Sequence, residues 1–525
     1  MAKDTAALAA EIERAVAHHQ AGRLQEAEAL YQQILQAQPD HPDVLNLLGV
    51  LTHQAGRHER ALDLINQAIK ITPDAAGYHN NLGEALTALG RYEDAVSAYK
   101  RALSLDPAYA EAHNNLGIVF LELGRPLEAV AVLEGAVSVR PDFAEAHYNL
   151  GNALDEAGKL KEAAAAYRQA IALEPDDAEI RSNLGIVLIE LGEVREAVKC
   201  FEHAIRGRPD FVDAHNNRGL ALLALGEFAE GWREWRYGQS GSLDLPQPKW
   251  TGEPFVGKTL LVHTEQGFGD TLQFARYLPM VKAKGGIVWL ACDRELQGLL
   301  GNSPGVDMVV GDPESLPWSR LDFDAHIALL DLPGLFETDL DTIPTDVPYL
   351  TPDPMIVDTW RQRIDSQTFN VGLCWAGRPT PRNRKRSSTL GAFAPLSQVA
   401  GVTFYSLQKG LPAQQAEDPP EGMNLVDYND ELHDFADTAA LLASLDLVIS
   451  IDTAIAHLAG GLDVPVWTLL PYAPAWRWLL EGETTPWYPT MRLFRQPAIG
   501  DWASMMAQVA TELARAIPVT QGHRL

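Results

Sequence analysis

The tripeptide Asn81-Leu82-Gly83 returns at intervals of 34 residues, as Asn115-Leu116-Gly117, Asn149-Leu150-Gly151 and Asn183-Leu184-Gly185. Glycine also keeps this register at Gly49 and Gly219. A period of this length is typical of stacked helix pairs, which build a binding surface rather than an active site. The repeat therefore predicts an α-helical array over the first part of the chain.

Three more residue types keep the same period. They are turn glycines, alanines of the second helix and boundary prolines: Gly22, Gly56, Gly90, Gly124, Gly158, Gly192, Gly226; Ala27, Ala61, Ala95, Ala129, Ala163, Ala197; Pro39, Pro73, Pro107, Pro141, Pro175, Pro209. Small residues let helices approach closely, turn glycines take a positive φ, and the prolines are expected to open helices. One unit alone cannot bury its apolar face, so the units must stack. The pattern resembles tetratricopeptide (TPR) repeats over residues 8–245 and implies an α-solenoid, the TPR superhelix.

The recurring asparagines are a separate feature of these repeats. Asparagine is a poor helix former, so helicity does not explain its recurrence at Asn81, Asn115, Asn149, Asn183 and Asn217. A carboxamide both donates and accepts hydrogen bonds, and can bind a peptide unit whatever its side chains. The series resembles the repeats of O-GlcNAc transferase, where such asparagines hold an extended peptide. The alternative is a ladder of hydrogen bonds between repeats with no ligand.

Composition restricts the partners and the compartment. The 525 residues carry a formal net charge of −28, which argues against a nucleic-acid partner or an anionic membrane surface. The isolated thiols Cys200, Cys292 and Cys374 have no metal-ligand spacing and suit a reducing compartment. No apolar leader follows Met1 and no run of eighteen apolar residues occurs, so we expect a cytoplasmic protein without membrane insertion. The oligomeric state stays open.

The period fails after Pro209, and Gly231 stands where the alanine is expected. Terminal repeats are usually atypical because they cap the stack. Trp232 and Trp235 are expected to pack the last repeat against the following domain, and residues 246–257 are expected to form a connector.

From Lys258 onward, short β-branched runs alternate with amphipathic stretches, as in parallel βα units. The expected strands are 258–263, 286–292, 306–310, 325–330, 369–376, 402–407, 446–452 and 464–470. The expected helices are 270–284, 434–445, 453–462 and 501–516. The region 333–367 has five prolines and little periodicity before Trp360, which predicts a division near 350–368 into two lobes, at 258–360 and 368–500. A C-terminal helix and tail at 501–525 are expected to follow.

Two segments that connect a strand to a helix carry polar side chains suited to a binding site. In Gly267-Phe268-Gly269-Asp270 a glycine turn leads into a helix, which places a carboxylate and free helical N–H groups at a sheet edge. The alternative is a tight turn with Asp270 as a helix cap. Because the motif lacks the third glycine of Gly-x-Gly-x-x-Gly, it does not predict a dinucleotide oxidoreductase.

The second such segment is Asp452-Thr453-Ala454, with His457 one helical turn later. Hydroxyl, amide and imidazole donors at a helix N-terminus suit a diphosphate. The alternative is that Thr453 caps the helix and His457 is a buried, hydrogen-bonded histidine.

These two motifs and their order resemble glycosyltransferase family 9, the ADP-heptose:lipopolysaccharide heptosyltransferases, over about residues 258–500. The family motif is Asp-Thr-Gly-x-x-His, and Ala454 departs from it where donor phosphates would pass. A bacterial subgroup that joins TPR repeats to such a domain is similar at Trp375–Gly377, Arg386-Ser387, Leu407–Gly410 and Trp487–Pro489. The resemblance implies a GT-B fold with two Rossmann-like lobes, an acceptor side at 258–360 and a donor side at 368–500. It also implies an inverting, metal-independent enzyme that uses a nucleotide-sugar and no cofactor.

Inverting transfer needs a base for the acceptor hydroxyl and positive groups for the leaving diphosphate. Asp270 is the first candidate base and Glu265 the second, although either can be structural. The basic run 377–388 contains Arg378 and Arg386, which are candidate phosphate ligands, although such a run is usually a solvated loop. The remaining candidates for donor binding are Gln408, for the nucleotide base, and Lys409; Trp476, Trp478 and Trp487 are expected to build the core.

The leading hypothesis is a protein glycosyltransferase whose repeats hold a polypeptide acceptor. One alternative keeps the enzyme but uses a lipid-linked or free glycan as acceptor, with the repeats serving assembly. The other alternative is an inactive TPR adaptor.

Overall fold

The computed structural model describes residues 2–238, 245–265, 267–312, 318, 321–378 and 386–517. The chain divides into two compact units, one formed by residues 1–191 and 206–208 and the other by residues 192–205 and 209–525. The second unit therefore contains the last repeat helices together with the α/β part.

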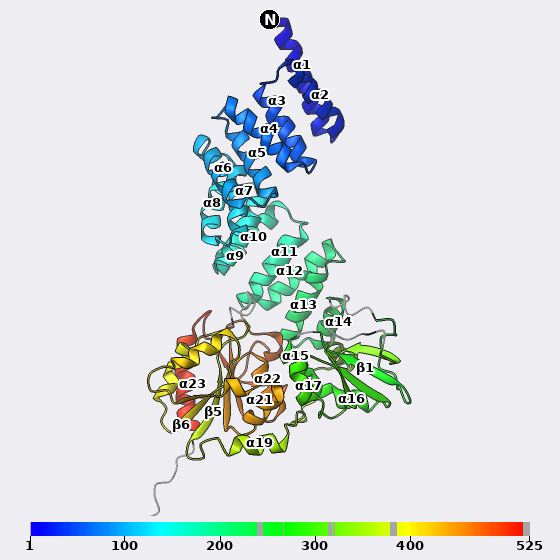
Figure 1. Ribbon diagram of the computed structural model, residues 1–525, viewed down its shortest axis with the longest axis vertical. Helices are drawn as coiled ribbons and strands as arrows, with labels where there is room; N and C mark the ends of the chain where they lie inside the picture. The colour runs from blue at the N-terminus through cyan, green and yellow to red at the C-terminus, as the bar shows by residue number, and fades with distance from the viewer. Residues whose placement is uncertain are drawn as a thin grey trace, which may run out of the picture. The chain divides into compact units, whose positions relative to one another are not determined.

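Within the described residues, the repeat region consists of seven helix pairs (Figure 1). The helices are α1 (Ala2–Gln20), α2 (Leu24–Ala37), α3 (Pro42–Gln54), α4 (His58–Ile71), α5 (Ala76–Ala88), α6 (Tyr92–Leu105), α7 (Ala110–Glu122), α8 (Pro126–Val139), α9 (Ala144–Glu156), α10 (Leu160–Leu173), α11 (Ala178–Glu190), α12 (Val194–Gly207), α13 (Val212–Ala224) and α14 (Phe228–Gly238). The predicted helical repeat is confirmed.

Both glycine positions have the predicted physical cause. The turn glycines from Gly22 to Gly226 all have φ between 66° and 81°, a region that residues with a Cβ rarely adopt. The helical glycine Gly117 faces Leu133, and a Cβ on it would lie 2.4 Å from Leu133 Cγ. The period is therefore set by one backbone requirement and one packing requirement.

The boundary prolines, in contrast, do not open helices as predicted. Pro73 lies in the turn between α4 and α5, three residues before α5 begins. Its carbonyl oxygen accepts a hydrogen bond from His79 Nε2 at 2.8 Å, and His113 bonds Pro107 in the same way at 3.0 Å. Proline ends the preceding helix because it lacks an N–H, and its carbonyl anchors the next helix.

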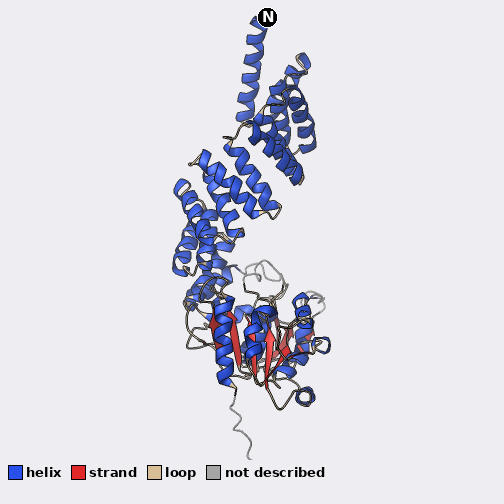
Figure 2. Ribbon diagram, turned by 90° about the vertical axis from the view of Figure 1, so that its left-hand side faces the viewer, coloured by secondary structure: helices blue, strands red, loops and turns tan. Residues whose placement is uncertain are grey.

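The α/β part contains two sheets. Their strands are drawn in red in Figure 2. The four-stranded sheet has the order β3-β2-β1-β4, and the seven-stranded sheet has the order β10-β11-β9-β8-β5-β6-β7. The strands are β1 (Thr259–His263), β2 (Ile287–Ala291), β3 (Met308–Gly311), β4 (Ala325–Ala328), β5 (Phe369–Cys374), β6 (Val402–Ser406), β7 (Leu425–Asp427), β8 (Leu447–Ile451), β9 (Val466–Leu470), β10 (Thr484–Thr485) and β11 (Tyr488–Arg495). All pairings are parallel except β10 with β11. The eight expected strands are confirmed, whereas β7, β10 and β11 were not predicted.

The α-helices of this part are α15 (Phe268–Phe274), α16 (Leu278–Lys282), α17 (Arg294–Leu300), α18 (Leu332–Leu335), α19 (Pro354–Arg361), α21 (Phe435–Leu442), α22 (Ala454–Gly461) and α23 (Trp502–Ala516). Alternate residues of the large sheet face two different cores. Val371 and Ile449 pack with α23, while Cys374 and Val448 pack with α21 and α22. Buried on both faces, these strands have the near-continuous apolar sequence of parallel sheets.

Tryptophans connect the last repeat helix to the α/β part inside the second unit. Trp232 Nε1 donates to the carbonyl oxygen of Thr338 at 2.8 Å, and its ring meets Trp476 edge-on at 5.2 Å. Trp478 and Trp487 are fully buried, as expected of core residues. The predicted packing role of these tryptophans is confirmed.

Candidate functional site

The strand order of the large sheet defines where a ligand would lie. Counted along the chain from β5, its six parallel strands lie in the order 3-2-1-4-5-6, so the order reverses between β5 and β8. Open α/β sheets bind ligands in the crevice beyond the carboxyl ends of the strands at such a reversal. The loops that follow β5 and β8 are therefore the expected walls of a site.

A cavity of about 620 Å³ occupies this place. Its walls come from the segments that follow β1, β5, β6 and β8, from the start of α21 and from Arg477. The predicted residues that line it are Gly267, Gly269, Asp270, Arg378, Arg386, Gln408, Lys409, Asp452, Thr453, Ala454 and His457. Residues separated by almost two hundred positions in the sequence therefore share one cavity.

Helix α22 presents an uncapped N-terminus to the cavity. Thr453 stands at the N-cap position in extended conformation, but its side chain accepts no hydrogen bond from the helix. The Thr453 hydroxyl instead lies 3.0 Å from Ser450 Oγ. The amide groups of Ala454 and Ile455 are thus open to an anion, whereas the N–H of Ala456 donates to the carbonyl oxygen of Thr453. The alternative in which the Thr453 side chain caps the helix is wrong.

Gly269 allows α15 to approach α22 closely. A Cβ at this position would lie 3.0 Å from His457 Cδ2 and 3.6 Å from Ala454 Cα. Glycine in the first turn of α15 therefore brings the segment after β1 against the segment after β8. A side chain at this position would press against the His457 ring and require it to shift by a few tenths of an ångström.

Asp452, Arg386 and His457 form a polar group in the wall of the cavity, in which Asp452 and His457 are buried. Asp452 is 4% exposed, with Oδ2 3.3 Å from Arg386 Nη1 and Oδ1 3.9 Å from His457 Nε2. His457 Nδ1 lies 2.9 Å from the hydroxyl of Tyr488. Burial lowers the pKa of His457 to about 4, although Asp452 acts in the opposite direction. His457 is therefore neutral at pH 7, and each ring nitrogen faces a polar partner.

Asp270 is held by an arginine that the sequence did not single out. Arg477 forms an ion pair with the Asp270 carboxylate, and both residues line the cavity. Burial lowers the pKa of Arg477 to about 10, which leaves it charged at pH 7. The guanidinium and the carboxylate therefore hold each other at the wall of the cavity.

Gln408 does not have the predicted role, which was contact with a nucleotide base. Its Oε1 accepts hydrogen bonds from the backbone N–H groups of Trp375 and Ala376 at 3.0 and 2.8 Å. Its Nε2 donates to the carbonyl oxygens of Ala376 and Lys409 at 2.9 and 3.0 Å. Both donor protons and both acceptor positions of the carboxamide are therefore bonded to the backbone. Gln408 holds the loop after β5 in place and has no hydrogen-bonding group left for a nucleotide base.

The two remaining cations have different surroundings. Lys409 Nζ donates to the carbonyl oxygens of Asn429 and Leu432, both at 2.6 Å, and burial lowers its pKa. One of its three protons remains for a ligand. The guanidinium of Arg378 lies over the ring of Phe268 at 5.0 Å. Residues 379–385 of the predicted basic run lie outside the described residues.

Glu265 does not line this cavity but belongs to a second polar cluster at the end of β1. Its Oε1 is 3.8 Å from His263 Nδ1, and His263 Nε2 is 3.2 Å from His326 Nδ1. Burial, helped by Asp331, raises the pKa of Glu265 to about 7, and burial lowers the pKa of His263 to about 3. The two candidate bases therefore lie in different surroundings, and only Asp270 is in the cavity.

The asparagine series forms hydrogen bonds between successive repeats. Each amide nitrogen donates to the residue 35 positions earlier: Asn81 to Asn46 at 3.0 Å, Asn115 to Asn80 at 3.3 Å, Asn149 to Asn114 at 2.9 Å and Asn183 to the Tyr148 hydroxyl at 3.2 Å. This ladder is the arrangement expected without a ligand. It uses the amide groups of these asparagines and leaves their carbonyl oxygens without a partner among the described residues.

A hollow of about 370 Å³ in the first unit contains part of this ladder. Asn149 and Asn183 line it, together with side chains from α7, α9, α10 and α11. Asn217 belongs to the second unit, and its side chain forms no hydrogen bond within the described residues. The structure therefore groups two of the five predicted peptide-binding asparagines around one hollow.

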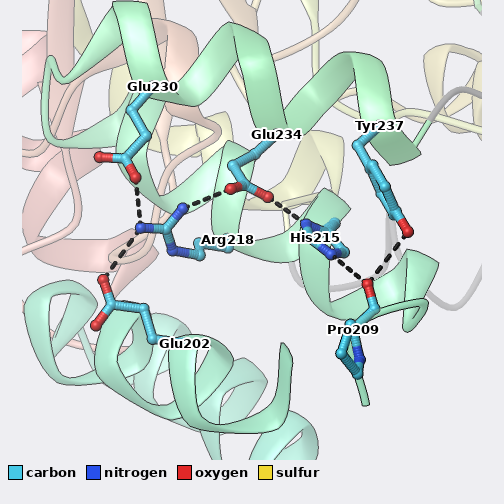
Figure 3. Close-up of polar contacts among 7 residues, drawn as sticks. All are labelled: Glu202, Pro209, His215, Arg218, Glu230, Glu234 and Tyr237. Atoms are coloured by element: carbon cyan, nitrogen blue, oxygen red, sulfur yellow. Dashed lines mark hydrogen bonds and ion pairs between the residues drawn. The ribbon is translucent and has the colours of Figure 1, made fainter. Parts of the chain in front are cut away.

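Arg218 replaces the leucine of the repeat and is only 8% exposed (Figure 3). Its guanidinium contacts the carboxylates of Glu202, Glu230 and Glu234 at 3.1, 2.7 and 2.7 Å. His215 lies between Glu234 and the carbonyl oxygen of Pro209. A buried charge persists only when it is paired, so these acids explain how the last repeat tolerates an arginine at an apolar position.

Among the described residues, no helix is both long and apolar enough to cross a membrane. No group of three or more His, Cys, Asp or Glu side chains in that part of the chain is arranged to hold a metal ion.

Comparisons with known proteins concern mainly the repeats. The family model described as the cilia and flagella-associated protein 70 C-terminal domain, a TPR domain, matches residues 2–220. Among curated proteins the chain is similar to Protein FlbA of Caulobacter vibrioides, with 31% identity over 313 residues, which are 54% of this chain and 52% of that protein. The chain thus spans about half the length of this curated relative.

Among solved structures the chain is similar to MamA, with 30% identity and a TM-score of 0.30 over 30% of this chain and 92% of that one. It is also similar to YrrB, described as a TPR protein with an unusual peptide-binding site, with 22% identity and a TM-score of 0.32 over 35% and 95% of the two chains. PilF of Pseudomonas aeruginosa shows 19% identity and a TM-score of 0.38 over 41% and 98%. With the family match and the seven helix pairs, the N-terminal part of the chain is a TPR α-solenoid.

Proposed function

We propose that the protein is an inverting, metal-independent glycosyltransferase that moves a sugar from a nucleotide-sugar to a polypeptide held by the TPR repeats. The observation that carries this proposal is the cavity after β5 and β8, because it collects Asp270, Arg386, Lys409, Asp452 and His457 around the open end of α22. Such a set of cations and helix amides fits a diphosphate.

The topology is compatible with the GT-B arrangement that the sequence resemblance implies. Both sheets are parallel at their centres, and both have the strand order of a Rossmann-like lobe around β1 and β5. The cavity draws one side from the segment after β1 and from Glu295 of α17, and the other side from segments of the large sheet. A cleft between two lobes is where a GT-B enzyme would bind its donor.

In this proposal each side chain has one role. The amides of α22, Arg386 and the third proton of Lys409 bind the diphosphate and stabilise the charge that develops as the bond from the sugar to the diphosphate breaks. The Asp270 carboxylate accepts the proton of the acceptor hydroxyl while the new bond to the anomeric carbon forms. Arg477 holds that carboxylate in place, and Asp452 orients Arg386.

The asparagine ladder supports a polypeptide acceptor, because hydrogen bonds between the repeats use only the amide nitrogens of its side chains. Asn115, Asn149 and Asn183 donate within the protein, but their carbonyl oxygens have no partner among the described residues. Carbonyl oxygens at a regular spacing suit the N–H groups of an extended peptide. The bonds between repeats also favour the alternative in which the repeats serve assembly and the acceptor is a glycan.

A panel of nucleotide-sugars read by thermal shift tests the donor, and mass spectrometry of cell proteins incubated with the matching donor tests the acceptor. The proposal expects stabilisation by one donor and a sugar-sized mass increase on a protein. Stabilisation together with transfer only to a glycan would favour the alternative acceptor. Failure of every nucleotide-sugar to bind would contradict the proposal.

A further inference from the structure

The hollow in the first unit has two kinds of wall. Half-buried aliphatic side chains, Ile118 and Leu121 of α7 and Ile186 of α11, form one strip. The exposed carboxylates of Glu122 and Glu156, which end helices α7 and α9, stand at its rim. The apolar strip in the hollow therefore leads to a negatively charged rim.

Polar groups deeper in the hollow fix its shape and leave an acceptor open. Asn149 is only 7% exposed, and its Oδ1 receives no hydrogen bond from any residue in the described ranges. Tyr167 donates its hydroxyl proton to Asn152 Oδ1 at 2.7 Å. Burial raises the pKa of Tyr167 strongly, and the nearby carboxylates of Asp155 and Glu156 raise it further. The phenol thus stays neutral, and the negative potential of the hollow comes from the carboxylates.

The rim acids are not required by the repeat itself. Glutamate occupies this register position at Glu122, Glu156 and Glu190, whereas the same position holds Gln54, Ala88 and Ala224 in other repeats. A scaffold that accepts glutamine or alanine has no packing need for glutamate. Neither Glu122 nor Glu156 forms an ion pair with a described residue, so their charges are available to a partner.

We propose that this hollow binds a lysine or arginine side chain of the acceptor polypeptide, which gives the repeats a preference for sequences with a basic residue at one position. The aliphatic stem lies along Ile118, Leu121 and Ile186, and the charged end meets Glu122 and Glu156. Asn149 Oδ1 accepts from the peptide backbone beside it. This inference rests on the proposed peptide acceptor and adds to it the chemistry of one recognised side chain.

Fluorescence anisotropy on the full chain tests the inference with labelled dodecapeptide libraries. The central residue is Lys, Arg, norleucine or Glu, and the flanking positions are randomised among uncharged residues. At low salt, the Lys and Arg libraries are expected to bind about tenfold more tightly than the norleucine library, and the difference should shrink as salt increases. Norleucine keeps the aliphatic stem of lysine, so the comparison isolates the charge.

Two pairs of substitutions complete the test. Glu122→Gln with Glu156→Gln should bring the Lys and Arg libraries down to the affinity of the norleucine library. Glu134→Gln with Glu162→Gln changes the net charge equally at exposed sites on the second helices and should preserve the preference. Equal binding of all four libraries, or a preference that survives the first pair, would overturn the basic-residue site and leave the peptide acceptor standing. No binding of any library would overturn both.

Discussion

Arg477 and Asp270 form an ion pair that joins the segment after β9 to the start of α15. The two residues are more than two hundred positions apart in the sequence, and both line the cavity. The side chain of Asp270 is 19% exposed, so the pair is shielded but open toward the cavity. This pair fixes the direction of the carboxylate that the proposal treats as the base.

Replacement of Asp270 by asparagine should cut turnover by roughly 100-fold or more and leave donor affinity largely intact, because it removes the proton acceptor and the charge that pairs with Arg477 but no group assigned to the diphosphate. Steady-state rates and calorimetric titration of the donor measure the two effects separately. Glu295→Gln is the matched control, since Glu295 also lines the cavity but has no assigned role. Wild-type turnover of Asp270→Asn with slow turnover of Glu265→Gln would transfer the role to Glu265.

Replacement of Arg386 by alanine should weaken the binding of a nucleoside diphosphate by about 1.5–3 kcal/mol, the value of a charge-assisted hydrogen bond. Calorimetry with a panel of nucleoside diphosphates measures the change. Arg361→Ala is the control, because that arginine is exposed and pairs with Asp358 on α19 outside the cavity. Equal affinities of the two variants for every nucleotide would remove Arg386 from the diphosphate site.

His457 should make the second unit less stable in acid. Its pKa is about 4 in the folded protein and about 6.5 when exposed, so the unfolded chain binds the proton first as the pH falls below 6.5. His457→Asn should therefore lose less unfolding free energy than the wild type between pH 7 and 4.5, by about 2 kcal/mol.

Tryptophan fluorescence during denaturant unfolding measures this effect selectively. All twelve tryptophans lie between Trp232 and Trp502, within the second unit. The pH dependence above 6.5 should be the same in both proteins. Parallel curves down to pH 4.5 would mean that His457 titrates normally and is not buried as described.

Replacement of Asn115, Asn149 and Asn183 together by alanine should abolish modification of a protein acceptor and spare slow hydrolysis of the donor. The same variant should also melt earlier, because each lost hydrogen bond between repeats costs about 1 kcal/mol. Intact-protein mass spectrometry measures transfer, and circular dichroism measures melting of the helices.

A second triple variant separates the two effects. Asn80→Ala, Asn114→Ala and Tyr148→Phe remove the acceptors of the same three hydrogen bonds but keep the ladder asparagines. This control should also melt earlier than the wild type, although Asn115 and Asn183 keep their bonds to Glu84 and Asn152. It should still modify the acceptor. Equal transfer by both triple variants would show that the asparagines only connect the repeats.

The fold was largely predictable because strong periodic signals set it. Gly90 and Gly117 recur for backbone and packing reasons that any helix-pair array imposes, and the eight apolar runs became strands. The antiparallel β10 and the edge strand β7 were missed because each has only two or three residues. The prediction that the boundary prolines open helices was wrong. The hydrogen bonds that their carbonyl oxygens accept from later histidines depend on the turn geometry, which the sequence pattern does not show.

The site was predictable only where a motif follows a strand. Asp452 and His457 come directly after β8, so their position at the sheet edge follows from the chain direction. Arg477 was missed because it lies between two core tryptophans in a 3₁₀ turn, although a charged residue within such an aromatic segment is a usable signal. The role of Gln408 depends on its hydrogen bonds to a loop more than thirty residues away, and the sequence does not show that the two segments are in contact.

Release of nucleoside diphosphate from the matching nucleotide-sugar, in the presence of excess EDTA, tests the central claim most directly. The account predicts release by the wild-type protein at the same rate with and without EDTA, and roughly 100-fold slower release by Asp270→Asn. Release that stops on addition of EDTA, or no release from any nucleotide-sugar of the panel, would contradict it.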